Sequence, residues 1–155
     1  MVYNYVLAAG VVSWFLAQII KTILNFIKFD KFNAERLIGA GGMPSSHTAM
    51  VVSALTAVGR TEGVGSTAFA VMFLLAAIVI YDAMGVRRAA GMHAKEINNI
   101  KKLIPDLINS SVSAIKDGKK VKVKELQEYL GHTPLEVIGG AILGLAVALI
   151  VPVNL

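Results

Sequence analysis

Apolar residues fall in four long blocks along the chain, covering residues 4–27, 48–59, 67–84 and 135–153. The first, third and fourth blocks approach the roughly 20 residues that a helix needs to cross the hydrocarbon core of a membrane, and the second is shorter. With 55% hydrophobic residues, this pattern is typical of an integral membrane protein. We therefore predict an all-α fold, a polytopic membrane helix bundle with about four transmembrane helices, forming one domain over residues 1–155.

Residues 94–130, between the third and fourth blocks, have a different pattern. Aliphatic residues recur there at helical spacing, with Lys, Asn and Ser between them, at Ile97, Ile100, Ile104, Leu107 or Ile108, and Ile115. The pattern predicts a cytoplasmic or interfacial helical insert, with a break near Pro105 and a second short helix over 121–130. Such a helix pair can lie on the anionic cytoplasmic leaflet, and a dimer contact fits the pattern equally well.

Basic residues gather in two of the connections. Three follow the first block, at Lys28, Lys31 and Arg36, and ten lie between the third and fourth blocks. The positive-inside rule then predicts that both basic loops are cytoplasmic and both termini are outside. The net charge of +5 is mostly a topology signal, and no aromatic platform or recognition module supports nucleic-acid binding. Small size and short loops favour a bacterial cell membrane.

The chain has no cysteine, which excludes disulfides, thiol nucleophiles and cysteine-ligated metals. The first block is too long, and too polar in its second half, for a cleavable signal peptide. We expect it to be a retained helix.

A glycine-rich turn, GGMPSSH at residues 41–47, precedes the second block. Unpaired N–H groups at a helix N-terminus attract anions, so a phosphate can dock against Ser45, Ser46 and the amides near Gly42. His47 would stand beside the bound oxyanion. The alternative is that Ser45 or Ser46 simply caps the helix.

Polar residues within the blocks need a reason to be there. Gln18, Lys21 and Asn25 share one helical face, and a lysine at this depth must reach the surface, pair with a charge or bind an anion. Asp82 closes the third block, just before Arg87 and Arg88, and we expect it to be buried. An Asp–Arg pair at the membrane edge would position a guanidinium for bidentate phosphate contact, although both arginines also serve as topology charges.

The fourth block opens with GHTPLEV at residues 131–137. Thr133, Pro134 and Glu136 predict a capping box, which needs no further function. His132 lies four residues before Glu136, so this carboxylate could hold one ring nitrogen and leave the other free. A histidine oriented in this way can act as a nucleophile or a base.

In order, these motifs resemble the superfamily of type 2 phosphatidic acid phosphatases and vanadium haloperoxidases, most closely its small divergent bacterial and plastid branch. The resemblance covers nearly the whole chain. It implies that Lys21 and Arg87 or Arg88 bind phosphate, that Ser45, Ser46 and His47 form the second motif, and that His132 is the nucleophile oriented by Glu136. Gln18, Asn25, Gly42 and Asp82 would support them. A rival assignment pairs Arg87 with His93, but it places Ile97 where an acid is expected.

The resemblance implies a phosphoric monoester hydrolase that needs no metal or cofactor and binds vanadate as a phosphate mimic. The expected substrate is a membrane lipid phosphate, such as a prenyl phosphate or phosphatidate, bound within the bilayer at the cytoplasmic face. Because four spans replace the six helices usual in the superfamily, the pocket would be thinly walled, and a homodimer could complete it. Two alternatives remain: a lipid-phosphate binding or translocating protein without turnover, and a structural membrane protein whose motifs are only helix caps.

Overall fold

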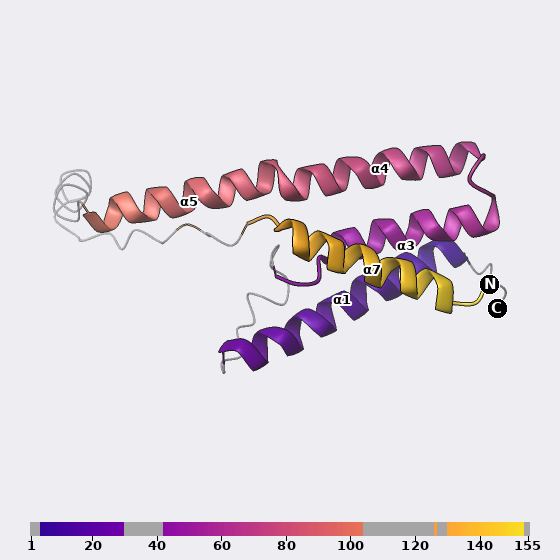
Figure 1. Ribbon diagram of the computed structural model, residues 1–155, viewed down its shortest axis with the longest axis horizontal. Helices are drawn as coiled ribbons and strands as arrows, with labels where there is room; N and C mark the ends of the chain where they lie inside the picture. The colour runs from indigo at the N-terminus through magenta and orange to yellow at the C-terminus, as the bar shows by residue number, and fades with distance from the viewer. Residues whose placement is uncertain (1–3, 30–41, 104–125, 127–129, 154–155) are drawn as a thin grey trace, which may run out of the picture.

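The computed structural model describes residues 4–29, 42–103, 126 and 130–153. Figure 1 shows the helices α1 (Tyr5–Phe29), α3 (Ser46–Thr61), α4 (Thr67–Met84), α5 (Val86–Leu103) and α7 (Pro134–Ile150). These described residues contain no strand, which confirms the all-α class. Each predicted apolar block corresponds to one helix, whereas the second short helix predicted over 121–130 lies largely outside the described residues.

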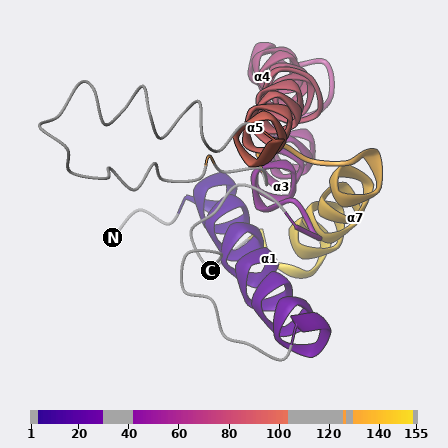
Figure 2. The ribbon, with the colours of Figure 1, turned by 90° about the vertical axis from the view of Figure 1, so that its left-hand side faces the viewer.

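α3 is the central helix of the bundle, and α1, α4 and α7 pack around it (Figure 2). Two glycines four residues apart let α7 approach α3 at backbone distance. A Cβ at Gly140 would lie 3.1 Å from Thr48 Cβ, and one at Gly144 would lie 3.0 Å from the Ser53 amide nitrogen. Small residues at this spacing are typical of helix contacts in membranes, because they allow close backbone packing.

Large apolar side chains face outward in this bundle. Leu7, Ile78 and Ile150 are 63%, 66% and 80% exposed, whereas the buried positions hold mainly alanine, serine and threonine. Contiguous apolar surface of this extent would be a liability in water and is expected where lipid is the solvent.

Arg60, in the last turn of α3, forms hydrogen bonds that join three helices at one end of the bundle. Its guanidinium donates to the Tyr5 hydroxyl and to the carbonyl oxygens of Ala148 and Val151, and it lies 5.5 Å from the centre of the Tyr5 ring. Tyr5 also donates to Ala148, so α1, α3 and α7 are joined at this end. A cation at the last carbonyls of α7 also complements that helix's dipole.

Two helical segments are long and apolar enough to cross a membrane, Tyr5–Ile27 with 23 residues and Thr67–Lys101 with 35. The second joins α4 and α5, which run nearly collinear, with α5 extending beyond the other helices (Figure 1). At 1.5 Å per residue this segment measures about 52 Å, well beyond the roughly 30 Å of hydrocarbon. Helical structure resumes at Val86, directly after Gly85, and α5 runs through residue 94, where the insert is predicted to begin.

Candidate functional site

Lys21 lies deep inside the bundle, with 2% of its surface exposed. It does not reach the surface of the chain, which argues against the snorkelling alternative. A Cβ built at Gly42 would lie 3.4 Å from Lys21 Cγ and 3.8 Å from Asn25 Nδ2, so the polar face of α1 meets the glycine-rich turn. Gly42 has φ of 88°, a conformation that favours glycine. Among the described residues, Lys21 has no hydrogen-bond or ion-pair partner.

Ser45 and Ser46 lie at the end of the glycine-rich turn, where α3 begins. Ser45 is the N-cap of α3, and its hydroxyl oxygen accepts from the Thr48 amide at 3.3 Å and from the Thr48 hydroxyl at 3.0 Å. Its amide donates to the Glu136 carbonyl at 2.9 Å. The Ser45 amide is therefore already paired, and its hydroxyl hydrogen is the donor that remains for an anion. Ser46 is buried and His47 is exposed.

Asp82 and Arg87 form an ion pair across the junction of α4 and α5, with 2.5 Å between Asp82 Oδ2 and Arg87 Nε. Their side chains are 39% and 50% exposed. The expectation that Asp82 is buried is wrong for the isolated chain, because α4 packs mainly on α3 and leaves its other faces without protein cover. The carboxylate engages Nε, and the two terminal nitrogens of Arg87 have no partner among the residues that the structure describes, so their donors are available to another ligand.

His132 is 2% exposed, and its ring is held by the first turn of α7. Nδ1 lies 3.1 Å from Glu136 Oε2, the same oxygen that accepts from the Thr133 amide at 3.0 Å. The Thr133 hydroxyl accepts from the Glu136 amide, which completes the predicted capping box. Nε2 is buried and has no hydrogen-bond partner among the described residues. An unpartnered buried ring nitrogen is costly and marks a position for a ligand or a reacting atom.

The backbone before α7 packs directly on the junction of α4 and α5. The His132 amide donates to the Ala83 carbonyl at 2.9 Å. Gly131 has φ of 85°, and a Cβ there would lie 2.5 Å from Arg88 Cα and 2.7 Å from the Arg87 carbonyl carbon. No side chain fits in that space, so glycine sets the separation between His132 and Arg87. Neither the Gly131 contact nor the role of the Ala83 carbonyl was predicted from the sequence.

Charged groups from the other segments shift the pKa values of His132 and His47. Burial lowers the pKa of His132; Glu136 raises it through a hydrogen bond and its charge, and Lys21 and Arg87 lower it. Desolvation lowers the pKa of His47, and the charges of Arg87, His132 and Lys21 lower it further, while Asp82 raises it. The four segments are thus close enough for their charges to interact. Of the two adjacent arginines, Arg87 is the one that pairs with Asp82 and the one whose charge lowers the pKa of both histidines.

Other candidates lie apart or have a different environment. His93, in the rival assignment, is exposed on α5, and Ile97 is 43% exposed. Gln18 has a buried Oε1 atom without a partner in the described part of the chain. The described residues hold no group of three or more His, Cys, Asp or Glu residues that could bind a metal ion.

These features define a helical membrane protein in which basic and imidazole groups form a cluster at one end of the bundle: Lys21, His47, Arg87 and His132. The chain belongs to the divergent PAP2 family, whose model matches residues 2–147. It is also 37% identical to the membrane protein YuiD of Bacillus subtilis (strain 168) over 147 residues, which cover 95% of this chain and 93% of YuiD. No solved structure matches the chain. The family confirms the resemblance drawn from the motifs, and YuiD supports a membrane location.

Proposed function

We propose that the chain is a membrane-embedded lipid phosphatase that uses His132 as its nucleophile and takes a prenyl phosphate or phosphatidate type of substrate. The observation that carries this proposal is the His132 ring, buried and fixed through Nδ1 by Glu136, with Nε2 unpartnered among the described residues. A neutral ring that donates its Nδ1 proton to Glu136 leaves the Nε2 lone pair free to attack. Lowering of the His132 pKa by burial favours that neutral form.

The phosphoryl group would be held by cations. Lys21 is buried, and Asp82 fixes Nε of Arg87; within the described part of the chain, neither Lys21 Nζ nor the two terminal nitrogens of Arg87 have a partner. Both charges lower the pKa of His132, and in this proposal both stabilise the oxygens of a phosphorus atom bound at Nε2. The Ser45 hydroxyl adds one donor from the start of α3. Positioned cations of this kind supply most of the catalysis in phosphoryl transfer.

The reaction then proceeds in two steps. As His132 Nε2 bonds to phosphorus, the bond from phosphorus to the lipid oxygen breaks, and His47 gives its proton to the leaving alkoxide. Water then attacks the phosphohistidine, His47 takes up a proton from it, and the nitrogen–phosphorus bond breaks to release inorganic phosphate. Since α1 and α4 are membrane helices with lipid-facing surfaces, the substrate's chain can remain in the bilayer while its phosphate enters the cluster.

The test is inorganic phosphate release by the detergent-purified protein from phosphatidate, prenyl phosphates and prenyl diphosphates, with and without vanadate. We expect vanadate-sensitive release that is lost in His132→Ala and kept in His93→Ala, a matched histidine exposed on α5. Lys21→Met should lose release, whereas Lys95→Met, also exposed on α5, should not.

The result separates the proposal from its rivals. Lipid-phosphate binding without release, unaffected by His132→Ala, would identify a binding or translocating protein. Release that depends on His93 instead of His132 would support the rival motif assignment. Absence of both release and vanadate binding would leave only a structural role.

A further inference from the structure

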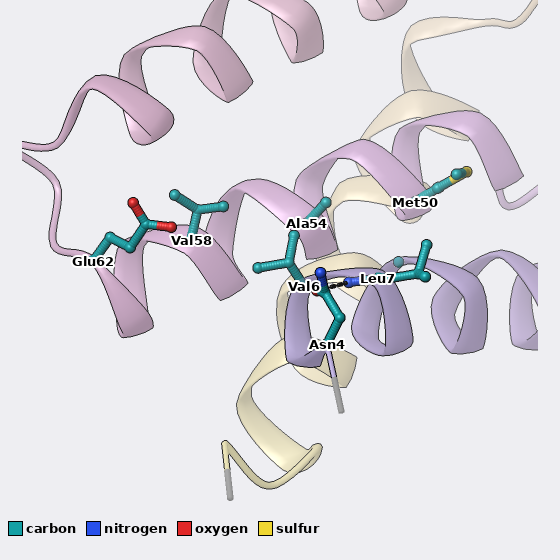
Figure 3. A pocket seen from close by; sticks show the side chains of 8 residues that line it. Asn4, Val6, Leu7, Met50, Ala54, Val58 and Glu62 are labelled. Atoms are coloured by element: carbon teal, nitrogen blue, oxygen red, sulfur yellow. Dashed lines mark hydrogen bonds between the residues drawn. The ribbon is translucent and has the colours of Figure 1, made fainter. Parts of the chain in front are cut away.

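A groove of about 340 Å³ lies between α1 and α3 and runs along α3 from Met50 to Glu62, just beyond the end of that helix (Figure 3). Apolar and small residues form its body: Val6, Leu7, Gly10, Met50, Ala54 and Val58. Two polar residues, Asn4 and Glu62, complete its lining. Its volume is at the lower end of the range for ligand sites, so it fits one slender ligand.

The groove follows the direction in which a lipid chain lies. Asn4 immediately precedes the first residue of α1, and Glu62 follows the last residue of α3, so the polar residues mark the end of the bundle where these helices meet the membrane surface. On α3 the lining residues recur every four positions from Met50 to Glu62. That interval corresponds to about 18 Å of helix, close to the roughly 15 Å depth of the hydrocarbon in one leaflet.

Small residues create the space. A Cβ at Gly10 would lie 3.8 Å from Ala54 Cβ, so α1 and α3 approach closely at these two small lining residues. Larger side chains at these two positions would close the groove. The floor of the groove thus depends on two residues, one from each helix.

The polar end has a specific charge and hydrogen-bonding character. Glu62 is exposed, and its carboxylate has no ion pair or hydrogen bond among the described residues. Asn4 Oδ1 accepts from the Leu7 amide at 3.0 Å as the cap of α1, which leaves the Asn4 amide hydrogens as donors. A carboxylate and an amide donor that line the same groove complement a headgroup that carries both an ammonium and a phosphate or ester oxygen.

We propose that this groove binds one acyl chain of a phosphatidylethanolamine molecule, with its ammonium at Glu62 and a phosphate or ester oxygen at the Asn4 amide. A primary ammonium donates hydrogen bonds to a carboxylate, which a choline headgroup cannot do, and an anionic headgroup would be repelled by Glu62. This lipid is distinct from the proposed substrate, because its headgroup would lie at Asn4 and Glu62, at the opposite end of α1 and α3 from Lys21 and His47. The proposal does not depend on phosphatase activity.

The test is native mass spectrometry of the purified protein after exchange into an equimolar mixture of phosphatidylethanolamine, phosphatidylcholine and phosphatidylglycerol. We expect the wild type to retain phosphatidylethanolamine preferentially. Glu62→Gln should lower that preference roughly two- to five-fold, the range for an exposed ion pair. Glu96→Gln, a matched acid exposed on α5, should leave it unchanged.

A second variant tests the apolar body of the groove. Ala54→Phe should fill it and abolish retention of the lipid, whereas Ala77→Phe, on an exposed position of α4, should not. Thermal unfolding in detergent checks that each variant is folded, and Glu62→Gln carries the test if Ala54→Phe is not. Equal retention of the three lipids by the wild type, preference for phosphatidylglycerol, or a preference unchanged by Glu62→Gln would overturn the proposal.

Discussion

Gly131 offers a direct test of how the fold sets the distance between His132 and Arg87. Its φ of 85° favours glycine, and a Cβ there would lie 2.5 Å from Arg88 Cα and nearer still to the Arg88 amide nitrogen. Ordinary Cβ contacts begin at 3.4 Å, so Gly131→Ala must move the two backbones apart by roughly 1 Å. A shift of that size at reacting groups can reduce kcat by about 100-fold.

Gly63 provides a matched control at the turn between α3 and α4. Its φ is 84°, but nothing lies within 4 Å of a Cβ built there. Both alanine variants bear the cost of a left-handed conformation, roughly 1–2 kcal/mol, whereas only Gly131→Ala adds a steric overlap, which typically costs a further 1–3 kcal/mol or so. We expect Gly63→Ala to have a slightly lower Tm and unchanged kcat.

The assay combines thermal unfolding in detergent with inorganic phosphate release at saturating lipid phosphate. Gly131→Ala should lose about 100-fold in kcat and unfold at a lower temperature than Gly63→Ala. If the two variants had the same Tm and kcat, the backbone of residues 131–132 would not set the geometry of the cluster. Were the wild type inactive, vanadate-induced stabilisation would replace kcat as the measure.

Two further predictions concern opposite ends of the bundle. Glu136→Gln should lower kcat by about 10²- to 10⁴-fold and move the acid limb of the kcat/KM profile to lower pH. Glu136 raises the pKa of His132, so its loss lets the ring stay neutral in more acidic solution. An unshifted acid limb would mean that another group titrates there. Arg60→Gln should destabilise the fold by about 1.5–3 kcal/mol, since it removes charge-assisted hydrogen bonds to the Tyr5 hydroxyl and to α7, whereas Lys95→Gln should change stability by less than about 0.5 kcal/mol in thermal unfolding.

Much of the fold could be predicted from the sequence, because a helix that crosses a lipid bilayer needs a long apolar block. The third block, 67–84, coincides with α4, and the spacing of Thr133 and Glu136 predicted the capping box that the structure contains. The spacing of Gly140 and Gly144 also indicates a close contact of α7 with another helix, but the contact with α3 was not predicted from it. Local chemistry sufficed for these features, because each depends on residues within a few turns.

The arrangement at the junction of α4 and α5 was less predictable. Arg87 and Arg88 are adjacent, so the sequence could not decide which one faces the histidines; that choice depends on how the chain leaves α4 at Gly85. The exposure of Asp82 depends on which helices cover α4, a property of the assembled bundle. The burial of Lys21 and His132 within a single chain is likewise a tertiary property, and it means that a second copy is not required to enclose either residue.

Glu136 explains why the capping and functional interpretations of residues 131–137 are not exclusive. One carboxylate oxygen accepts from the Thr133 amide, which helps to start α7, and also lies 3.1 Å from His132 Nδ1. The carbonyl of the same residue accepts from the Ser45 amide, so the start of α3 is fixed to the start of α7. A helix cap is rigid because its geometry is dictated by backbone groups that must be satisfied. The histidine therefore takes its orientation from hydrogen bonds that the fold needs in any case, and a shift of either helix start would also move the ring.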